Sequence, residues 1–216
     1  MLNYYDSFLN FEPNEREIAI IKRMGWKGFG FALTDLDYSH IFFSLKEEKI
    51  RVLHFLKYDE KTISKLPLNV KTKLVIYAKI SSEKELMNMV KKKEIRALII
   101  DASSLKKTLS REVVNILKQH EDKLIIVTFS SLLDPSRNPL TQIAVIREKE
   151  RLLYKLRKQL IFASGAASIL QMSSPRVFKD TLFEIGIREE VIILGLSKNP
   201  ESLFRMPNPI ILDGIK

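Results

Sequence analysis

The sequence predicts an α/β fold of the TIM-barrel type, with about seven strand–helix units, parallel strands inside and helices outside. Two observations support this prediction. Short β-branched runs alternate along the chain with segments whose apolar residues recur at helical spacing. Most of the short runs are almost continuously apolar, as in Ala97–Ile100 and Leu124–Val127, which is typical of strands buried on both faces. An open, doubly wound sheet is the alternative arrangement.

The expected strands follow these apolar runs in chain order. Each is four to six residues long, which is the usual strand length in such a sheet. They cover Tyr4–Phe8, Gly28–Leu33, Arg51–Phe55, Lys73–Ala78, Ala97–Asp101, Leu124–Phe129 and Leu160–Ala163.

Helices are expected between the strands, where capping residues and apolar spacing agree. Asn138 and Ser174 each precede a proline, which favours the first position of a helix. Gly25 and Gly186 are expected to end two of the helices. Glu189–Leu196 has the composition of a strand as well as a helix, so its residues alone leave both open. The expected helices are Asn14–Met24, Ser82–Lys92, Arg111–Gln119 with Ser110 as N-cap, Pro139 to about Lys158, and Pro175 to Gly186.

No low-complexity linker divides the 216 residues, so we expect a single barrel domain over 1–216. Pro207 and Pro209 indicate an extended C-terminal tail over 207–216. No run reaches the roughly 18 apolar residues of a membrane span, and the N-terminus lacks the pattern of a signal peptide. The chain has no cysteine, which fits a cytoplasmic protein and removes thiolate chemistry.

The formal net charge of +10 and the pI near 9.6 favour a polyanionic partner. Lysine and arginine gathered on one face bind a phosphate backbone by releasing its counterions. The alternative is that the charge serves only solubility.

The sequence contains few signs of a catalytic site. The chain has no G-x-S-x-G elbow and no glycine-rich phosphate loop. Its three histidines, His40, His54 and His120, are too few for a multinuclear metal cluster. Acidic residues are expected at strand ends, where they could act as acid and base, although capping of the next helix is the simpler interpretation. These residues are Asp6, Asp35, Asp37 and Asp101.

Basic residues give a stronger signal. The helix from Pro139 carries like charges four residues apart, and this mutual repulsion would be relieved by an external anion. Arg176 is expected in the first turn of a capped helix, where free amides and a bidentate arginine favour phosphate, and Arg137 precedes a similar helix start. For each, an ordinary solvated surface residue is the alternative. The predicted RNA-binding residues are therefore Arg137, Arg147, Arg151, Lys155, Arg157, Lys158, Arg176 and Lys179.

Residues 160–204 hold a specific pattern that begins with Ser164-Gly165-Ala166. It continues through Ser173–Arg176 and Gly186–Glu190 to Gly195–Pro200. This pattern resembles the C-terminal signature of RNase P protein component 3, an archaeal and eukaryal family of RNA-binding, barrel-like proteins. Elsewhere the chain matches that family in layout. The resemblance implies a helix over 189–196.

The resemblance implies a non-catalytic subunit of ribonuclease P, which removes the 5′ leader of precursor tRNA. In that family the RNA performs the chemistry with Mg²⁺, and the protein would bind no cofactor itself. Expected partners are RNase P RNA, component 2 in a heterotetramer, the other protein subunits and, indirectly, precursor tRNA. The family's basic loop after the fifth strand corresponds to Lys106 and Lys107 here. Ser173 stands where the family has an arginine. The family has a second arginine after the sixth strand, and the corresponding segment here, Phe129–Leu132, does not contain it.

The same family resembles the PHP phosphoesterases in fold. Those enzymes place Asp-x-His-x-His after their first strand, to bind metal. Here Tyr5–Leu9 keeps Asp6 but lacks the histidines, so we expect neither catalytic nor metal-binding residues in the barrel. Two alternatives remain open, a PHP-type metal-dependent phosphoesterase and a scaffold that only assembles other proteins.

Overall fold

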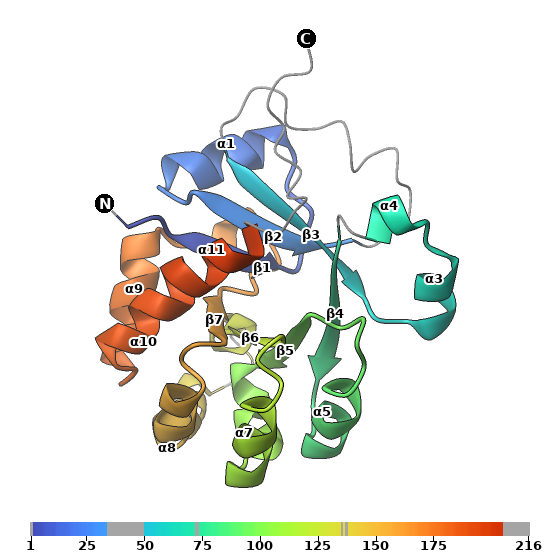
Figure 1. Ribbon diagram of the computed structural model, residues 1–216. Coiled ribbons are helices and arrows are strands. Elements are labelled where there is room, and N and C mark those ends of the chain that lie inside the picture. Colours follow the sequence, from blue (N-terminus) through green and yellow to red (C-terminus); the bar gives the residue numbers. More distant parts are fainter. Residues whose placement is uncertain (1, 34–49, 72–73, 135, 137, 205–216) are drawn as a thin grey trace.

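Seven parallel strands follow one another around the sheet in the order β1 to β7, with helices on the outside (Figure 1). The computed structural model describes residues 2–33, 50–71, 74–134, 136 and 138–204. All seven expected strands are confirmed, two of them with the predicted boundaries and five with boundaries shifted by one or two residues; the expected first residue of the fourth strand, Lys73, lies outside the described residues. They are β1 (Tyr5–Leu9), β2 (Gly28–Ala32), β3 (Arg51–Lys57), β4 (Val75–Ile80), β5 (Ala97–Asp101), β6 (Leu124–Thr128) and β7 (Leu160–Ala163).

The Ser164-Gly165-Ala166 turn brings the end of β7 to β1 and nearly closes the barrel. The Gly165 amide donates to the Phe8 carbonyl at 3.1 Å, and the Asn10 amide donates to the Ala166 carbonyl at 2.8 Å. Gly165 has φ 65°, and a Cβ there would lie 2.8 Å from the Cβ of Thr128. Glycine is the residue that allows both the positive φ and the close approach of Thr128. The backbone conformation of the turn therefore explains why the sequence pattern has a glycine here.

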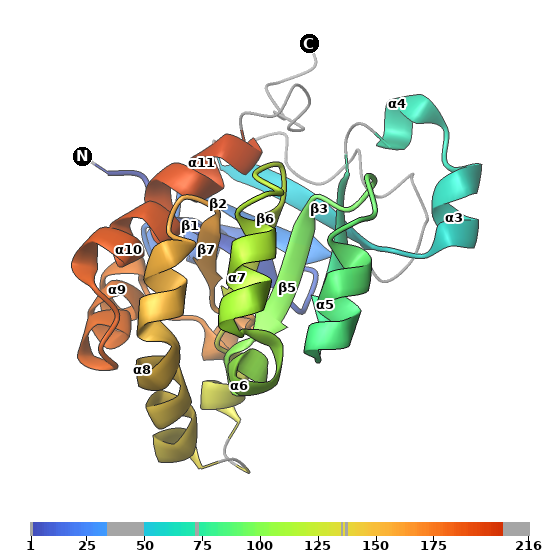
Figure 2. The same ribbon diagram turned by 60° about the horizontal axis from the view of Figure 1, so that its bottom comes forward.

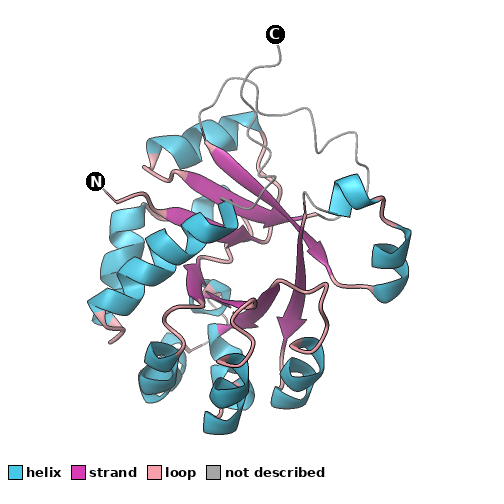
Figure 3. Ribbon diagram, viewed as in Figure 1, coloured by secondary structure: helices cyan, strands magenta, loops and turns pink. Residues whose placement is uncertain are grey.

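Helices occupy the outside of the barrel, and Figure 3 shows them surrounding the strands. The expected caps are present at Ser110, Asn138 and Ser174. Asn14 and Ser82, expected as the first residues of two helices, are also N-caps. The longest helix starts at Pro139 as predicted but ends at Lys155. Figure 2 shows α5, α7 and α8 in a row. The predicted helices are observed as α1 (Glu15–Arg23), α5 (Glu83–Met89), α7 (Arg111–Leu117), α8 (Pro139–Lys155) and α9 (Pro175–Glu184).

The ambiguous segment after Gly186 is helical. It comprises α10 (Glu189–Ile193), a π-helical turn at Leu194–Lys198 and α11 (Asn199–Phe204). Several short elements were not predicted: α3 (Glu60–Lys65), α4 (Leu68–Lys71), α6 (Leu105–Thr108) and the 3₁₀ turns Ala102–Ser104, Ser130–Leu133 and Ile169–Gln171. No helix in the described part of the chain could cross a membrane.

The interior of the barrel is filled by side chains. Phe8 contacts Phe55 and Tyr77 edge to face, each with ring centroids 5.3 Å apart. At the amino-terminal end, Phe204 of α11 stacks on Tyr5, the first residue of β1, at 4.7 Å. This apolar cluster is separate from the larger one between the strands and the outer helices. The barrel therefore has a packed aromatic core, and α11 covers its amino-terminal end.

Candidate nucleic-acid interface

The loops that follow the strands gather at the carboxyl-terminal end of the barrel, where TIM-barrel enzymes place their active sites. Here they surround a polar depression of about 480 Å³, in which Lys79 is the one cation among the lining residues. Asp101 at the end of β5 accepts from the Ser103 amide at 3.0 Å and from the Ser130 hydroxyl at 2.7 Å. Burial disfavours its charge, but the hydrogen bonds outweigh burial and lower the pKa of Asp101. As expected, Asp101 is a capping residue.

Asp6 is not at a strand end, so that expectation is wrong. It is the second residue of β1 and is fully buried, and its Oδ1 accepts the Ser164 amide at 2.9 Å. Its Oδ2 has no hydrogen-bond partner among the residues that the structure describes. Burial raises the pKa of Asp6 to about 6, although the hydrogen bonds from Ser164 and Phe8 oppose the rise. The carboxyl group fastens β1 to the end of β7.

His54 lies within β3, buried against Phe31 with ring centroids 4.9 Å apart. Burial lowers its pKa to about 4. Within the described ranges, no three histidine or acidic residues come together in a group that could hold a metal ion. His40, Asp35 and Asp37 lie outside those ranges, as does the expected tail over 207–216.

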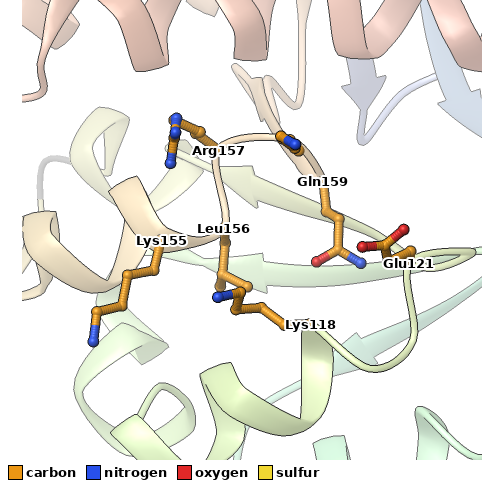
Figure 4. Close-up of a pocket in the computed structure, with 7 residues that line it drawn as sticks. Lys118, Glu121, Lys155, Leu156, Arg157 and Gln159 are labelled. Atoms are coloured by element: carbon orange, nitrogen blue, oxygen red, sulfur yellow. The ribbon is translucent and has the colours of Figure 1, made fainter.

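A basic pocket opens at the opposite, amino-terminal end of the barrel. It has a volume of about 410 Å³ and lies where the chain enters β6 and β7 (Figure 4). Four of its seven lining residues are cations and one is a carboxylate. We refer to these seven as the β6–β7 pocket: Lys118, Glu121, Lys155, Leu156, Arg157, Lys158 and Gln159.

Two buried amides fix the backbone of the β6–β7 pocket. Nε2 of Gln159 donates to the carbonyls of Leu117, His120 and Lys123 at 3.2, 2.8 and 3.3 Å. Nδ2 of Asn199 donates to the carbonyls of Arg157 and Leu160, each at 2.6 Å. The loop before β6 is thus tied to the loop before β7, and the latter is tied to α11.

Arg157 is held in place by its neighbours. Its Nε contacts Oε1 of Glu190 at 3.1 Å, and its guanidinium lies 4.4 Å from the ring centroid of Tyr154. Arg188 lies 4.2 Å from the same ring and pairs with Glu150 at 2.9 Å. These contacts join α8 to α10 and limit the movement of Arg157.

The structure divides the predicted RNA-binding residues between regions. Lys155, Arg157 and Lys158 come together in the β6–β7 pocket, and Arg151 lies one turn earlier on α8. Arg176, Lys106 and Lys107 follow the carboxyl-terminal ends of β7 and β5, at the other end of the barrel. Arg137 lies outside the described residues.

Two of the predicted residues, Arg147 and Lys179, form contacts within the protein, and a third, Arg176, is almost fully exposed. Arg147 is bound to carbonyl groups at the end of α9. Lys179 pairs with Glu189 at 2.8 Å, which raises the pKa of the lysine through that hydrogen bond. Arg176 approaches Asp180 only at 3.9 Å, and its side chain is 92% exposed.

Lys118 is the cation of the β6–β7 pocket that was not predicted from the sequence. It ends α7, just before β6, and stands more than thirty positions from Lys155 along the chain. The adjacency of β6 and β7 brings the two lysines to one pocket. That adjacency is expected for consecutive parallel strands, so a search of the loops before neighbouring strands could have found Lys118.

Comparisons with known proteins identify similar folds. The chain aligns with one from archaeal ribonuclease P with mature tRNA, solved by cryo-EM, with a TM-score of 0.69, 14% identity, and 97% of this chain and 96% of that chain covered. Molinate hydrolase gives a TM-score of 0.58 at 11% identity, with 95% and 73% covered. A crystal structure of an apo Agrobacterium tumefaciens protein gives 0.52 at 11% identity, with 97% and 98% covered. No protein-family model and no curated protein matches the sequence. The chain therefore shares its barrel fold, over nearly its whole length, with proteins of low sequence identity that include a chain of archaeal ribonuclease P.

Proposed function

We propose that this chain is an RNA-binding protein subunit of ribonuclease P, related to component 3, without an active site of its own. The observation that carries the proposal is the end-to-end match to a chain of archaeal ribonuclease P. The sequence pattern over 160–204, which resembles that of component 3, supports the same family independently of the overall fold. The net charge of +10 fits a protein whose main partner is RNA.

In this role the protein neutralises phosphate groups where RNA helices pack together. Each lysine or arginine that contacts a phosphate releases counterions, and this stabilises the compact RNA. The contacts go to the backbone and position the RNA without reading its bases. Mg²⁺ is bound by the RNA and supplies the chemistry at the scissile phosphate, so the protein needs no metal ligands.

The partners that follow are RNase P RNA and the other protein subunits of the enzyme. The resemblance to component 3 leads us to include component 2, with which this chain would form a heterotetramer. Precursor tRNA would meet the protein only through the assembled enzyme.

The test is cleavage of precursor tRNA by an archaeal RNase P RNA at low Mg²⁺, with component 2 and with or without this protein. We expect cleavage to increase only when both proteins are present. No increase, with component 2 shown to be active on the RNA, would overturn the proposal. A phosphatase screen with added Mn²⁺ would then test the phosphoesterase alternative.

A further inference from the structure

We propose that the β6–β7 pocket binds a backbone phosphate of the RNA, so that RNA approaches the amino-terminal end of the barrel. The proposal rests on the proposed function, because it takes RNA as the partner. It assigns the contact to the end opposite the one where TIM-barrel enzymes bind their substrates. Lys118, Lys155 and Lys158 would contact the phosphate, and Arg157 would line the site.

The charge of the pocket supports an anionic ligand. Lys118, Lys155 and Lys158 form no ion pair with any described residue, whereas Arg157 pairs with Glu190. Glu121 is the one acidic residue in the lining. Cations placed together without counter-charges repel one another, and a bound phosphate would remove that repulsion.

Helix ends explain only part of this charge. Lys118 and Lys155 stand at the C-termini of α7 and α8, where a cation complements the helix dipole. Arg157, just beyond the end of α8, donates from Nη1 to the Tyr154 carbonyl in the last turn at 3.3 Å and pairs with Glu190. Lys158 follows it in the loop before β7, where the dipole effect falls away. Lys158 is therefore the cation that the helix ends do not explain, and a phosphate site explains it.

The pocket is also preorganised. Its two loops are tied together by Gln159, and Asn199 fixes the carbonyls of Arg157 and Leu160. Arg157 is held by Glu190 and Tyr154. A site whose backbone is fixed before binding loses less conformational freedom on binding. A volume of about 410 Å³ leaves room for a phosphodiester group with part of its sugar.

A variant of Glu121 tests the site through an expected gain in RNA binding, whereas damage to the fold would weaken binding. In Figure 4 its carboxylate lies on the side of the pocket opposite Lys155 and Arg157. It would repel a phosphate there, so the isosteric change Glu121→Gln should strengthen RNA binding. Loss of the fold would remove the pocket and is not expected to increase affinity, so a gain with an unchanged melting temperature would come from the lost carboxylate.

The decisive experiment measures binding of the full chain to RNase P RNA over a range of salt concentrations. The first variant is Lys118→Ala/Lys155→Ala/Lys158→Ala. The control, Lys61→Ala/Lys65→Ala/Lys84→Ala, removes the same charge from exposed lysines of α3 and α5. The pocket variant should reduce the log–log salt slope by about 0.7–0.9 for each lost contact, and Glu121→Gln should tighten binding about twofold or more.

The outcomes separate the two proposals. Equal losses in the pocket variant and the control, or an unchanged pocket variant, would overturn the phosphate site while wild-type binding and cleavage still support the proposed function. Absence of RNA binding by the wild-type chain would overturn both. Weaker binding of the pocket variant alone, with an unchanged melting temperature and a gain for Glu121→Gln, would establish the site.

Discussion

Arg147 of α8 caps the carboxyl-terminal end of α9 through the carbonyl oxygen of Ile185. Its Nε lies 3.1 Å from that oxygen, and its Nη2 lies 3.2 Å from the carbonyl oxygen of Glu184. Carbonyl groups in the last turn of a helix lack partners within the helix. Gly186 has φ 99°, and a Cβ there would lie 3.2 Å from Cγ of Arg147, so the arginine packs against the turn that ends α9. These contacts use Nε and Nη2 of the five-donor guanidinium, so Arg147 has a structural role that is independent of RNA binding.

Arg147→Ala should therefore destabilise the fold. Losing hydrogen bonds from a charged donor to two helix carbonyls should cost about 1–2 kcal/mol in a partly exposed site. Urea denaturation measures this change in the free energy of unfolding. Arg151→Ala is the control, since Arg151 lies one turn along α8, is exposed and should change stability by less than about 0.5 kcal/mol. Equal stability of the two variants would show that the Arg147 cap contributes nothing.

Asn199 is expected to be among the most sensitive positions in the C-terminal segment. Asn199→Ala leaves the buried carbonyls of Arg157 and Leu160 without the amide that now donates to both. Unsatisfied buried groups cost about 1–3 kcal/mol each, so we expect a loss of about 3 kcal/mol. Ser202→Ala is the control: its hydroxyl donates to the Asn199 carbonyl at 2.6 Å but is exposed. Thermal unfolding of both variants should show a clearly lower melting temperature only for Asn199→Ala.

The strands were predictable because a strand buried on both faces leaves a short apolar run in the sequence. β5 and β7 were predicted to the residue, and helix starts were fixed by their caps at Ser110, Asn138 and Ser174. The order of the strands followed from the rule that consecutive parallel strands are neighbours. Most of the fold could therefore be predicted from local sequence patterns.

The site was less predictable, because charge along the chain does not reveal what each side chain contacts. Arg147 and Arg151 look alike in sequence, yet only Arg147 reaches the end of α9. Asp6 was expected at a strand end, but β1 continues to Leu9 with a register shift after Asp6. Lys118 joins Lys155 only through the packing of two distant loops. The contacts of Arg147 and Asp6 depend on tertiary structure, which residue spacing does not encode, whereas the position of Lys118 follows from the adjacency of β6 and β7.

Gly195 in the π-helical turn leaves no room for a side chain. A Cβ at this position would lie 2.7 Å from Cδ2 of Phe162 in β7. Overpacking of this kind usually costs about 1–3 kcal/mol, and we expect that loss for Gly195→Ala. The double variant Gly195→Ala/Phe162→Leu should recover part of the loss, because the smaller side chain removes the clash. Additive losses in urea denaturation of the single and double variants would exclude the clash as the cause.

Asp6 and His54 should give the free energy of unfolding opposite dependences on pH. The pKa of Asp6 rises from 3.8 to about 6 on folding, so between these values the folded state binds more protons and stability falls as pH rises. The pKa of His54 falls from 6.5 to about 4, so in nearly the same range the unfolded state binds more protons and stability rises with pH. The two contributions largely cancel in the wild type.

Removing either group should reveal the other. Relative to wild type, Asp6→Asn should become more stable as pH increases from 4 to 6.5, by up to about 3 kcal/mol, since each pKa unit corresponds to about 1.4 kcal/mol. His54→Phe should show the opposite trend, with a relative loss of up to about 3 kcal/mol between pH 4 and 6. Urea denaturation at constant ionic strength measures both differences, and all other titrating groups are common to the three proteins. Relative slopes of the same sign in the two variants would contradict the burial of an acid and a base with oppositely shifted pKa values.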